Sequence, residues 1–182
     1  VGDTREIVAL VPSASGASVF VPRFLCAQKP PPGHRTPAQA ARFVSLVPFL
    51  EDWQTFHSGD SDVWCTSQEF LDICAGDWEE HAILLHNYLL DLGGGDGAGG
   101  DGGGAPASNV QHYLVIGRGI AEGATCYVAQ VRGGGRAGAD VVLWNACTGE
   151  AYSARDDKCP LVDVGTLVTP DNVWANVQRV GR

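Results

Sequence analysis

The stretch Ala75–Gly93 reads AGDWEEHAILLHNYLLDLG and predicts a long helix in the interior of the protein. Asp77 and Glu80 have the spacing of a capping box, so we expect the helix to run from Trp78 to about Leu92. One stripe of this helix is apolar and consists of Ala82, Leu85, Leu89 and Leu92. Further apolar residues widen the stripe until little polar surface remains: Ile83, Leu84, Tyr88 and Leu90. Such a helix is expected to be the central, buried one.

Shorter elements are predicted before the central helix. Residues 7–10 and 18–25 have the composition of short strands or extended segments. Thr36 and Pro37 then begin a helix that ends near Pro48, because threonine is a good N-cap and proline suits the first helical position.

A second short helix is predicted directly before the central one. Thr66 and Glu69 have capping-box spacing at its start. Gly76 is placed to end it, since glycine readily adopts the left-handed backbone conformation that closes many helices.

The sequence after the central helix is typical of strands. Three segments and one weaker candidate alternate with turn residues: HYLVIG (112–117), TCYVAQV (125–131), DVVLWNA (140–146) and YSA (152–154). Thr169-Pro170-Asp171 predicts a last short helix through NVWANVQ (172–178). Helices followed by an antiparallel sheet indicate an α+β domain with the central helix packed on the sheet.

The domain boundaries follow from two glycine-rich segments and a proline-rich break. Residues 1–35 are expected to form an extended segment that leads into a domain over 36–182, with insertions at 93–104 and 132–139. The insertion Gly93–Gly104 lacks the lysine and hydroxyl residue of a phosphate loop, and its aspartates lack calcium-loop spacing. We expect a flexible loop without a ligand.

The composition limits the class of protein. The chain has 182 residues, 45% of them hydrophobic, which suits one globular domain. No apolar run could span a bilayer, and the start without methionine suggests a piece excised from a longer protein. The six cysteines have no CxxC spacing, so no structural zinc site is expected, and we interpret them as reduced, mostly buried thiols.

The charge is unevenly distributed. The net charge is −9, and Phe43–Gly117 holds 12 of the 21 acidic residues and no lysine or arginine. This opposes nucleic-acid binding, which needs basic patches against phosphate. The acidic segment forms either a solvated surface or a face for a basic partner. Like charge also argues against tight binding of acidic tubulin tails there.

The order of elements resembles papain-like and transglutaminase-like folds, in which a cysteine at a helix start is paired with a histidine and an orienting residue. The helix dipole and the imidazolium lower the thiol pKa. Aligned with the transglutaminase-like pattern, Gly76 and Ala82 place Trp78 at the cysteine, while TCYVAQV places Thr125 at the histidine. Asn145 suits the third position. The resemblance thus predicts a degenerate triad and no catalytic, cofactor or metal residue.

Other reactive residues provide the alternative of an active peptidase or transglutaminase-like enzyme with a relocated thiol. Cys74 is expected at the end of the preceding helix, where the dipole disfavours a thiolate, and alternation is expected to turn Cys126 away from the Thr125 face. His81 and His86 are five residues apart and share no face, and EEHAILLH is not a HExxH zinc motif. His112 opens a strand and is expected to be exposed or satisfied.

Several segments together resemble one family over about residues 42–178: RFVSLVPFL, the central stretch from DVWCTSQEF onward, IAEGATCYVAQV, VVLWNACTGEAYSA and CPLVDVGTLVTPDNVWANVQ. They are similar to the coiled-coil and C2-domain-containing protein 2A family of the ciliary transition zone. The resemblance implies a catalytically inactive, transglutaminase-like domain of a cytoplasmic scaffold at the cilium base. That scaffold serves cilium assembly and gating and has partners with B9 or C2 domains, with no cofactor and no membrane insertion. A related centrosomal protein carries a similar domain.

Overall fold

The central stretch forms helix α4, Trp78–Gly94, in the computed structural model, which describes residues 7–55, 62–94, 110–133 and 139–176. All residues from 81 to 89 are buried, so the prediction of a central, buried helix is confirmed. Its start has the expected capping pair. Glu80 Oε2 accepts the backbone N–H of Asp77 at 3.1 Å, and Asp77 Oδ1 accepts that of Glu79 at 3.4 Å.

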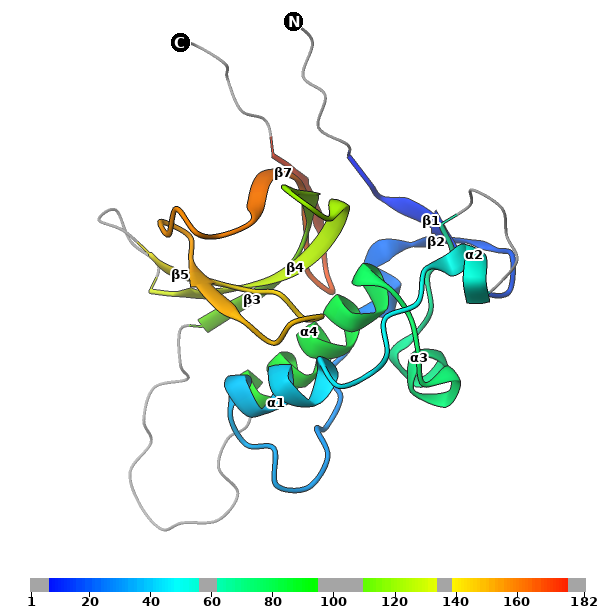
Figure 1. Cartoon of the computed structure of the whole chain (residues 1–182), viewed down its shortest axis with the longest axis horizontal. Coiled ribbons are helices and arrows are strands. Elements are labelled where there is room, and N and C mark those ends of the chain that lie inside the picture. Colours follow the sequence, from blue (N-terminus) through cyan, green and yellow to red (C-terminus); the bar gives the residue numbers. More distant parts are fainter. Residues whose placement is uncertain (1–6, 56–61, 95–109, 134–138, 177–182) are drawn as a thin grey trace, which may run out of the picture.

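A six-stranded antiparallel sheet covers one side of α4 (Figure 1). The strand order is β6-β5-β4-β3-β7-β8, and α4 packs on the central pair, β3 and β4. The strands are β3 (Val110–Gly119), β4 (Gly123–Arg132), β5 (Asp140–Trp144), β6 (Ala151–Ser153), β7 (Leu161–Val168) and β8 (Val173–Ala175). The α+β class, with the central helix on an antiparallel sheet, is confirmed.

The sheet separates two apolar clusters. Side chains on its inner face pack with α4, among them Leu114, Cys126, Val128 and Trp144. Side chains on its outer face form a second cluster around Val115, Tyr127 and Ala129. Strand β4 is therefore apolar on both faces, because each of its residues points opposite to its neighbour and both sides are covered.

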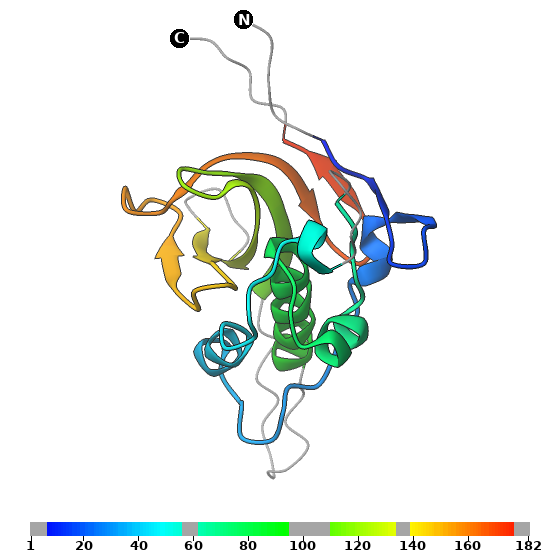
Figure 2. The same cartoon turned by 45° about the vertical axis from the view of Figure 1, so that its right-hand side comes forward.

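Two predicted helices flank α4 on the side away from the sheet (Figure 2). Helix α1 spans Pro37–Val44, and α3 spans Ser67–Ile73. Each begins with a complete capping box, from Thr36 in α1 and from Thr66 in α3. The capping residues thus mark both helix starts as the sequence indicated.

The N-terminal part adds small elements to the same core. These are β1 (Leu10–Pro12), paired with β2 (Ser18–Phe20), the 3-10 helix η1 (Val21–Phe24) and, further on, the one-turn helix α2 (Asp52–Thr55). Strand β2 is shorter than predicted because Pro22 sits at the start of η1 and ends the extended run. Val21 and Phe24 are buried in the cluster around α4, so residues 7–35 share the core of the domain.

Two predictions about elements are wrong, and one strand was not predicted. Helix α3 ends at Cys74, which takes the left-handed conformation at φ 61°, and not at Gly76. The predicted last helix is instead strand β8, which pairs with β7. Strand β7 itself was not predicted. Its neighbours β3 and β8 hold the C-terminal segment in the sheet, and this pairing overrides the local helix signal.

Most of both glycine-rich insertions lies outside the described residues, namely 95–104 of the first and 134–138 of the second. Within the described part, none of the helices is both long enough and apolar enough to cross a bilayer.

Candidate functional site

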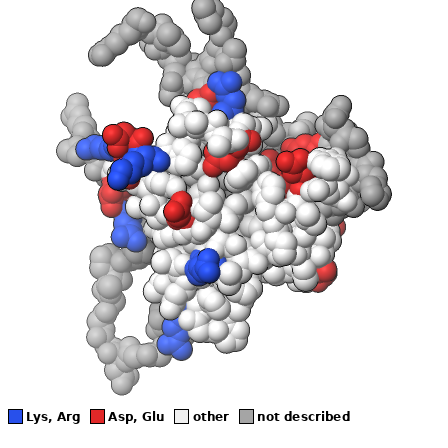
Figure 3. All heavy atoms as spheres, in the orientation of Figure 1, with Lys and Arg blue, Asp and Glu red and all other residues white. Residues whose placement is uncertain are grey.

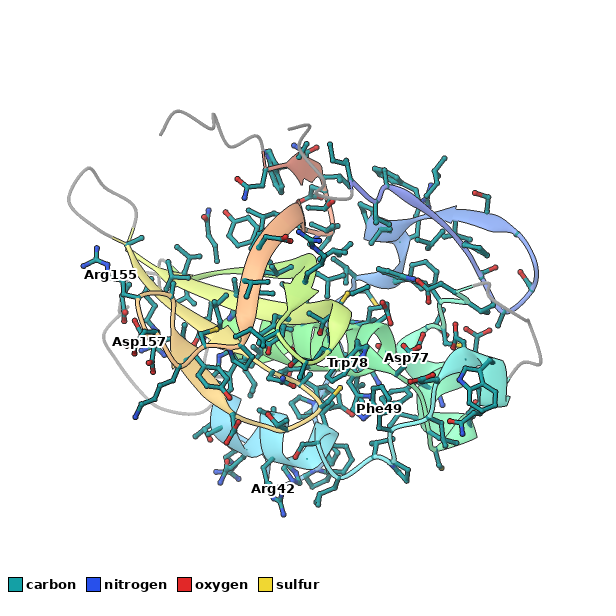
Figure 4. The ribbon with its side chains drawn as sticks, turned by 45° about the horizontal axis from the view of Figure 1, so that its top comes forward. Arg42, Phe49, Asp77, Trp78, Arg155 and Asp157 are labelled. Carbon is teal, nitrogen blue, oxygen red and sulfur yellow. The ribbon has the colours of Figure 1, made fainter. Side chains whose placement is uncertain are left out.

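Trp78 opens α4 beneath a strap formed by residues 47–50. The Phe49 and Trp78 rings are 4.8 Å apart between centroids, and Figure 4 shows them side by side, with Asp77 beside them. Leu50 donates its backbone N–H to Gly76 O at 2.9 Å, which fixes the strap to the helix start. Trp78 is half-buried, so its indole fills the position directly under the strap.

His81 contacts the same strap through the backbone carbonyl of Val47. Its ring nitrogens lie 2.6 Å from the Asp77 carbonyl and 3.0 Å from the Val47 carbonyl. Burial lowers the pKa of His81, against these hydrogen bonds, which raise it. The histidine is therefore a buried structural group between two backbone carbonyls, and in its neutral form it donates its single N–H to one of them.

The three residues of the predicted degenerate triad are not brought together. Thr125 is buried on β4, and strand alternation places it on the outer face with Tyr127. Asn145 donates to the Tyr127 hydroxyl at 3.0 Å, so it also belongs to that face. Trp78 lies on α4, across the sheet. No hydrogen bond or ring contact between described residues joins Trp78 to Thr125 or Asn145.

Cys126 occupies the inner position on β4 that the sequence analysis gave to Thr125. It is buried in the α4 cluster, and its Sγ lies 4.0 Å from Glu79 Oε1. Cys126 and Thr125 lie on opposite faces of the sheet, as alternation predicted, but Cys126 is the one that faces α4. The two side chains that face each other between the start of α4 and β4 are therefore the carboxyl of Glu79 and the thiol of Cys126.

Five carboxylates gather at the start of α4, and four of them are buried: Asp52, Asp62, Asp77, Glu79 and Glu80, of which Asp62 is exposed. Burial, with repulsion from Asp77 and Asp62, raises the pKa of Asp52 to about 7. Burial and the neighbouring Asp77 also raise the pKa values of Glu79 and Glu80 well above the usual range. This cluster was missed from the sequence because its members come from separate segments.

The carboxylate cluster contains the described residues best suited to hold a cation. Oxygen atoms of Asp52, Asp62 and Asp77 lie within 4.8 Å of one another, as do those of Asp77, Glu79 and Glu80. Such all-oxygen donor sets suit Ca²⁺ or Mg²⁺ rather than zinc. They provide no imidazole or thiolate for covalent chemistry.

The thiols around this cluster are held in the protonated form. Burial, followed by repulsion from neighbouring carboxylates, raises the pKa of Cys65 to about 12 and raises those of Cys126 and Cys147 well above the ordinary value. Cys74 is exposed at the C-cap of α3, and its Sγ lies 3.2 Å from the Leu71 carbonyl. Among the described residues, no hydrogen bond joins a cysteine to a histidine.

The thiols are less buried than predicted. All six are free, but only Cys65 and Cys126 are buried, while Cys26 and Cys74 are exposed and Cys147 and Cys159 are intermediate. The sequence could not show this, because cysteine fits both core and loop positions.

We expect limiting iodoacetamide at pH 7 to label the exposed Cys26 and Cys74 first, because access and thiolate fraction control the rate. Cys126 should label at least tenfold more slowly, at a rate set by local opening. Peptide mapping by mass spectrometry measures the order. Labelling of Cys126 or Cys147 ahead of Cys74 would contradict the buried, protonated state described above.

Two further histidines lie between α4 and the sheet, at the other end of the helix. His86 is fully buried, and neither ring nitrogen makes a hydrogen bond of normal geometry. The Gln130 amide donates to Nε2 of His112 at 3.2 Å, and His112 is buried rather than exposed. Burial is the main cause that lowers both pKa values to about 4. No hydrogen bond between described residues joins either histidine to a thiol.

Comparison with solved structures supports the fold. Legionella pneumophila LapG aligns with a TM-score of 0.53 and 14% identity, and the match covers 85% of this chain and 71% of LapG. This likeness concerns the fold alone. The predicted transglutaminase-like fold class is confirmed.

Comparison with curated sequences supports the predicted resemblance. Protein CC2D2B of Homo sapiens is 32% identical over 184 residues, which cover 96% of this chain and 11% of that protein. Coiled-coil and C2 domain-containing protein 2A of Drosophila melanogaster is 25% identical over 183 residues, which cover 98% of this chain and 12% of that protein. The chain thus spans about a tenth of the length of the curated relatives it matches.

A family model described as the CEP76 peptidase-like domain matches residues 62–99 and 102–182. The match takes in α3, α4 and the six-stranded sheet but not the strap or α2, which precede it. Because it spans more than half of the chain, the chain belongs to the CEP76 peptidase-like domain family.

Proposed function

We propose that this domain is a noncatalytic protein-interaction module. The observation that carries the proposal is the pairing across the inner face of the sheet, where Glu79 meets Cys126 and no hydrogen bond between described residues joins this thiol to a histidine. A cysteine nucleophile needs a base and a lowered pKa. Here the thiol is surrounded by acidic groups that raise its pKa.

The electrostatics at the start of α4 oppose thiol chemistry in general. A helix N-terminus carries about half a positive charge, which favours a thiolate nearby. Burial nevertheless raises the pKa of Cys126, and Glu79, Asp77 and Glu80 at this same helix start raise it further. Trp78 and Phe49 fill the space under the strap, so a substrate would also have to displace an aromatic pair.

The sequence relatives support a role for the whole protein at the cilium. We propose that the chain is part of a scaffold at the cytoplasmic base of the cilium, in the transition zone, where it contributes to cilium assembly and gating. The similarity to CC2D2B and CC2D2A over nearly the whole chain supports this. Other transition-zone proteins with B9 or C2 domains are the proposed partners. Trp78, Thr125 and Asn145 supply neither a thiol nor an imidazole and do not converge, so the absence of a working triad at these three positions remains part of this proposal.

Activity assays on the purified domain test the noncatalytic role. We expect no release of product from fluorogenic peptides and no incorporation of an amine into a glutamine donor, above the rate of the Cys126→Ala variant. Alanine fits the buried Cys126 site, so this control keeps the fold. The alternative, an enzyme with a relocated thiol, requires activity that disappears when one cysteine is replaced. Such a result would overturn the noncatalytic proposal.

A further inference from the structure

Large apolar side chains are exposed around the strap over α4. Five residues of this kind form what we term the strap face: Leu46, Phe49, Leu50, Trp53 and Ile73. Trp53 is 55% exposed and Leu46 is 63% exposed. Single exposed apolar residues are ordinary, but a cluster of this size marks an interaction site.

The members of the strap face are held together by the fold. Leu50 is hydrogen-bonded to Gly76, and Ile73 at the end of α3 precedes that glycine by three residues. The Phe49 ring packs on Trp78 at the start of α4. Trp53 lies one helical turn beyond the strap, and its Nε1 donates to Glu51 Oε2. The strap, the adjoining α2 and the end of α3 therefore carry these exposed apolar side chains on segments that the fold holds close together.

The surroundings of the strap face are mainly acidic, with the exposed Arg42 in the last turn of α1, four residues before Leu46, as the nearest basic residue in the sequence. Glu51, Glu69 and Asp72 are exposed on the strap and on α3, and the whole segment Phe43–Gly117 contains no lysine or arginine. In Figure 3 the right-hand part of the molecule, where α2 and α3 lie in this view, shows acidic and no basic side chains.

We propose that the strap face docks a basic amphipathic segment of a partner protein, one that combines lysine or arginine with large apolar anchors. This inference rests on the noncatalytic role proposed above and specifies its surface and partner chemistry. The apolar residues would seat the anchors, and Glu51, Glu69 and Asp72 would attract the cations. A second copy of this chain or an anionic membrane would instead meet like charge at this face.

A model peptide tests this without knowledge of the partner. The probe is a fluorescein-labelled 18-residue amphipathic helix of lysine and leucine, titrated with the domain and followed by anisotropy. Peptides with glutamate for lysine, or serine for leucine, keep the length and remove one feature each. We expect saturable binding of the lysine–leucine peptide alone. Its affinity should fall at least tenfold between about 50 and 300 mM salt, because screening weakens exposed charge contacts.

Matched surface variants locate the binding. Trp53→Ser should weaken the lysine–leucine peptide at least tenfold, whereas Trp174→Ser, at a tryptophan exposed on β8, should leave its affinity within twofold. The double variant Glu51→Gln, Asp72→Asn should act like Trp53→Ser. Its control, Asp156→Asn, Asp157→Asn, removes two charges from an exposed loop outside the strap face. Circular dichroism confirms that each variant is folded.

The outcomes separate this inference from the proposed function. Binding that the control variants weaken as much as the strap variants, or no binding at all, overturns the strap face as the docking site. Mass spectrometry of the peptide after the titration answers the other question. A cleaved or crosslinked peptide overturns the noncatalytic role, whereas an intact peptide bound elsewhere leaves that role standing and removes only the strap face.

Discussion

We expect Glu80→Ala to lower the free energy of unfolding by about 3 kcal/mol relative to the wild type. Glu80 is buried, and its carboxylate accepts the backbone N–H of Cys65 at 3.0 Å and that of Asp77 at 3.1 Å. Alanine would leave both donors without a partner, and each unpaired buried donor costs on the order of 1–3 kcal/mol. Burial raises the pKa of Glu80, so removing a carboxyl that is costly to ionise in the interior offsets part of that cost without changing the sign.

Glu69→Ala is the matched control, because Glu69 has the same place in the capping box of α3 but is exposed. It accepts the backbone N–H of Thr66 at 2.8 Å, and water can replace it there. The expected loss is about 1 kcal/mol. Urea unfolding at pH 7 measures both variants. Equal losses would show that Glu80 serves only as a helix cap and that the connection to Cys65 contributes nothing.

Capping residues explain why the helices could be predicted well. Thr36, Thr66 and Asp77 are each N-cap residues whose side chains accept a backbone N–H within the first helical turn. The structure contains all three of these hydrogen bonds. The burial of α4 could also be predicted, since few of its positions are polar. These signals are local, so a single sequence contains them completely.

The candidate site could be predicted only in part, because it depends on strand register and on contacts between distant segments. Cys126 and Tyr127 both lie in a run that is apolar on both faces, so alternation could not show which one faces α4. The strap over Trp78 is held by backbone bonds to Gly76, which leave no pattern in the side chains. The exposed apolar run from Leu46 to Trp53 was the available signal.

The C-terminal strands were missed for a different reason. Thr169-Pro170-Asp171 is a sound helix start by composition, yet the chain turns there and Val173–Ala175 pairs with β7. Pairing with an existing sheet edge gives hydrogen-bond partners to backbone N–H and C=O groups that a short helix would leave without any. Strand β7 has a β-bulge opposite β3, which interrupts the simple alternation in LVDVGTLV.

Removal of His86 is expected to change the pH dependence of stability. The pKa of His86 is about 4 in the folded protein and about 6.5 in an unfolded chain, so the unfolded state binds the proton first as pH falls. The wild type therefore loses stability from this group between pH 6.5 and 4, by about 2 kcal/mol at pH 5. His86→Leu should gain this amount relative to wild type between pH 7 and pH 5.

Asp52→Asn is the matched variant with the opposite sign. The pKa of Asp52 is about 7 in the folded protein against 3.8 for the free group, so the folded state binds the proton first and gains stability as pH falls from 7. Asparagine keeps an acceptor for the Val63 N–H and cannot titrate. Relative to wild type, Asp52→Asn should lose about 2 kcal/mol between pH 7 and pH 5. Urea unfolding at both pH values measures the two differences, and changes of the same sign in both variants would contradict the burial of one or the other group.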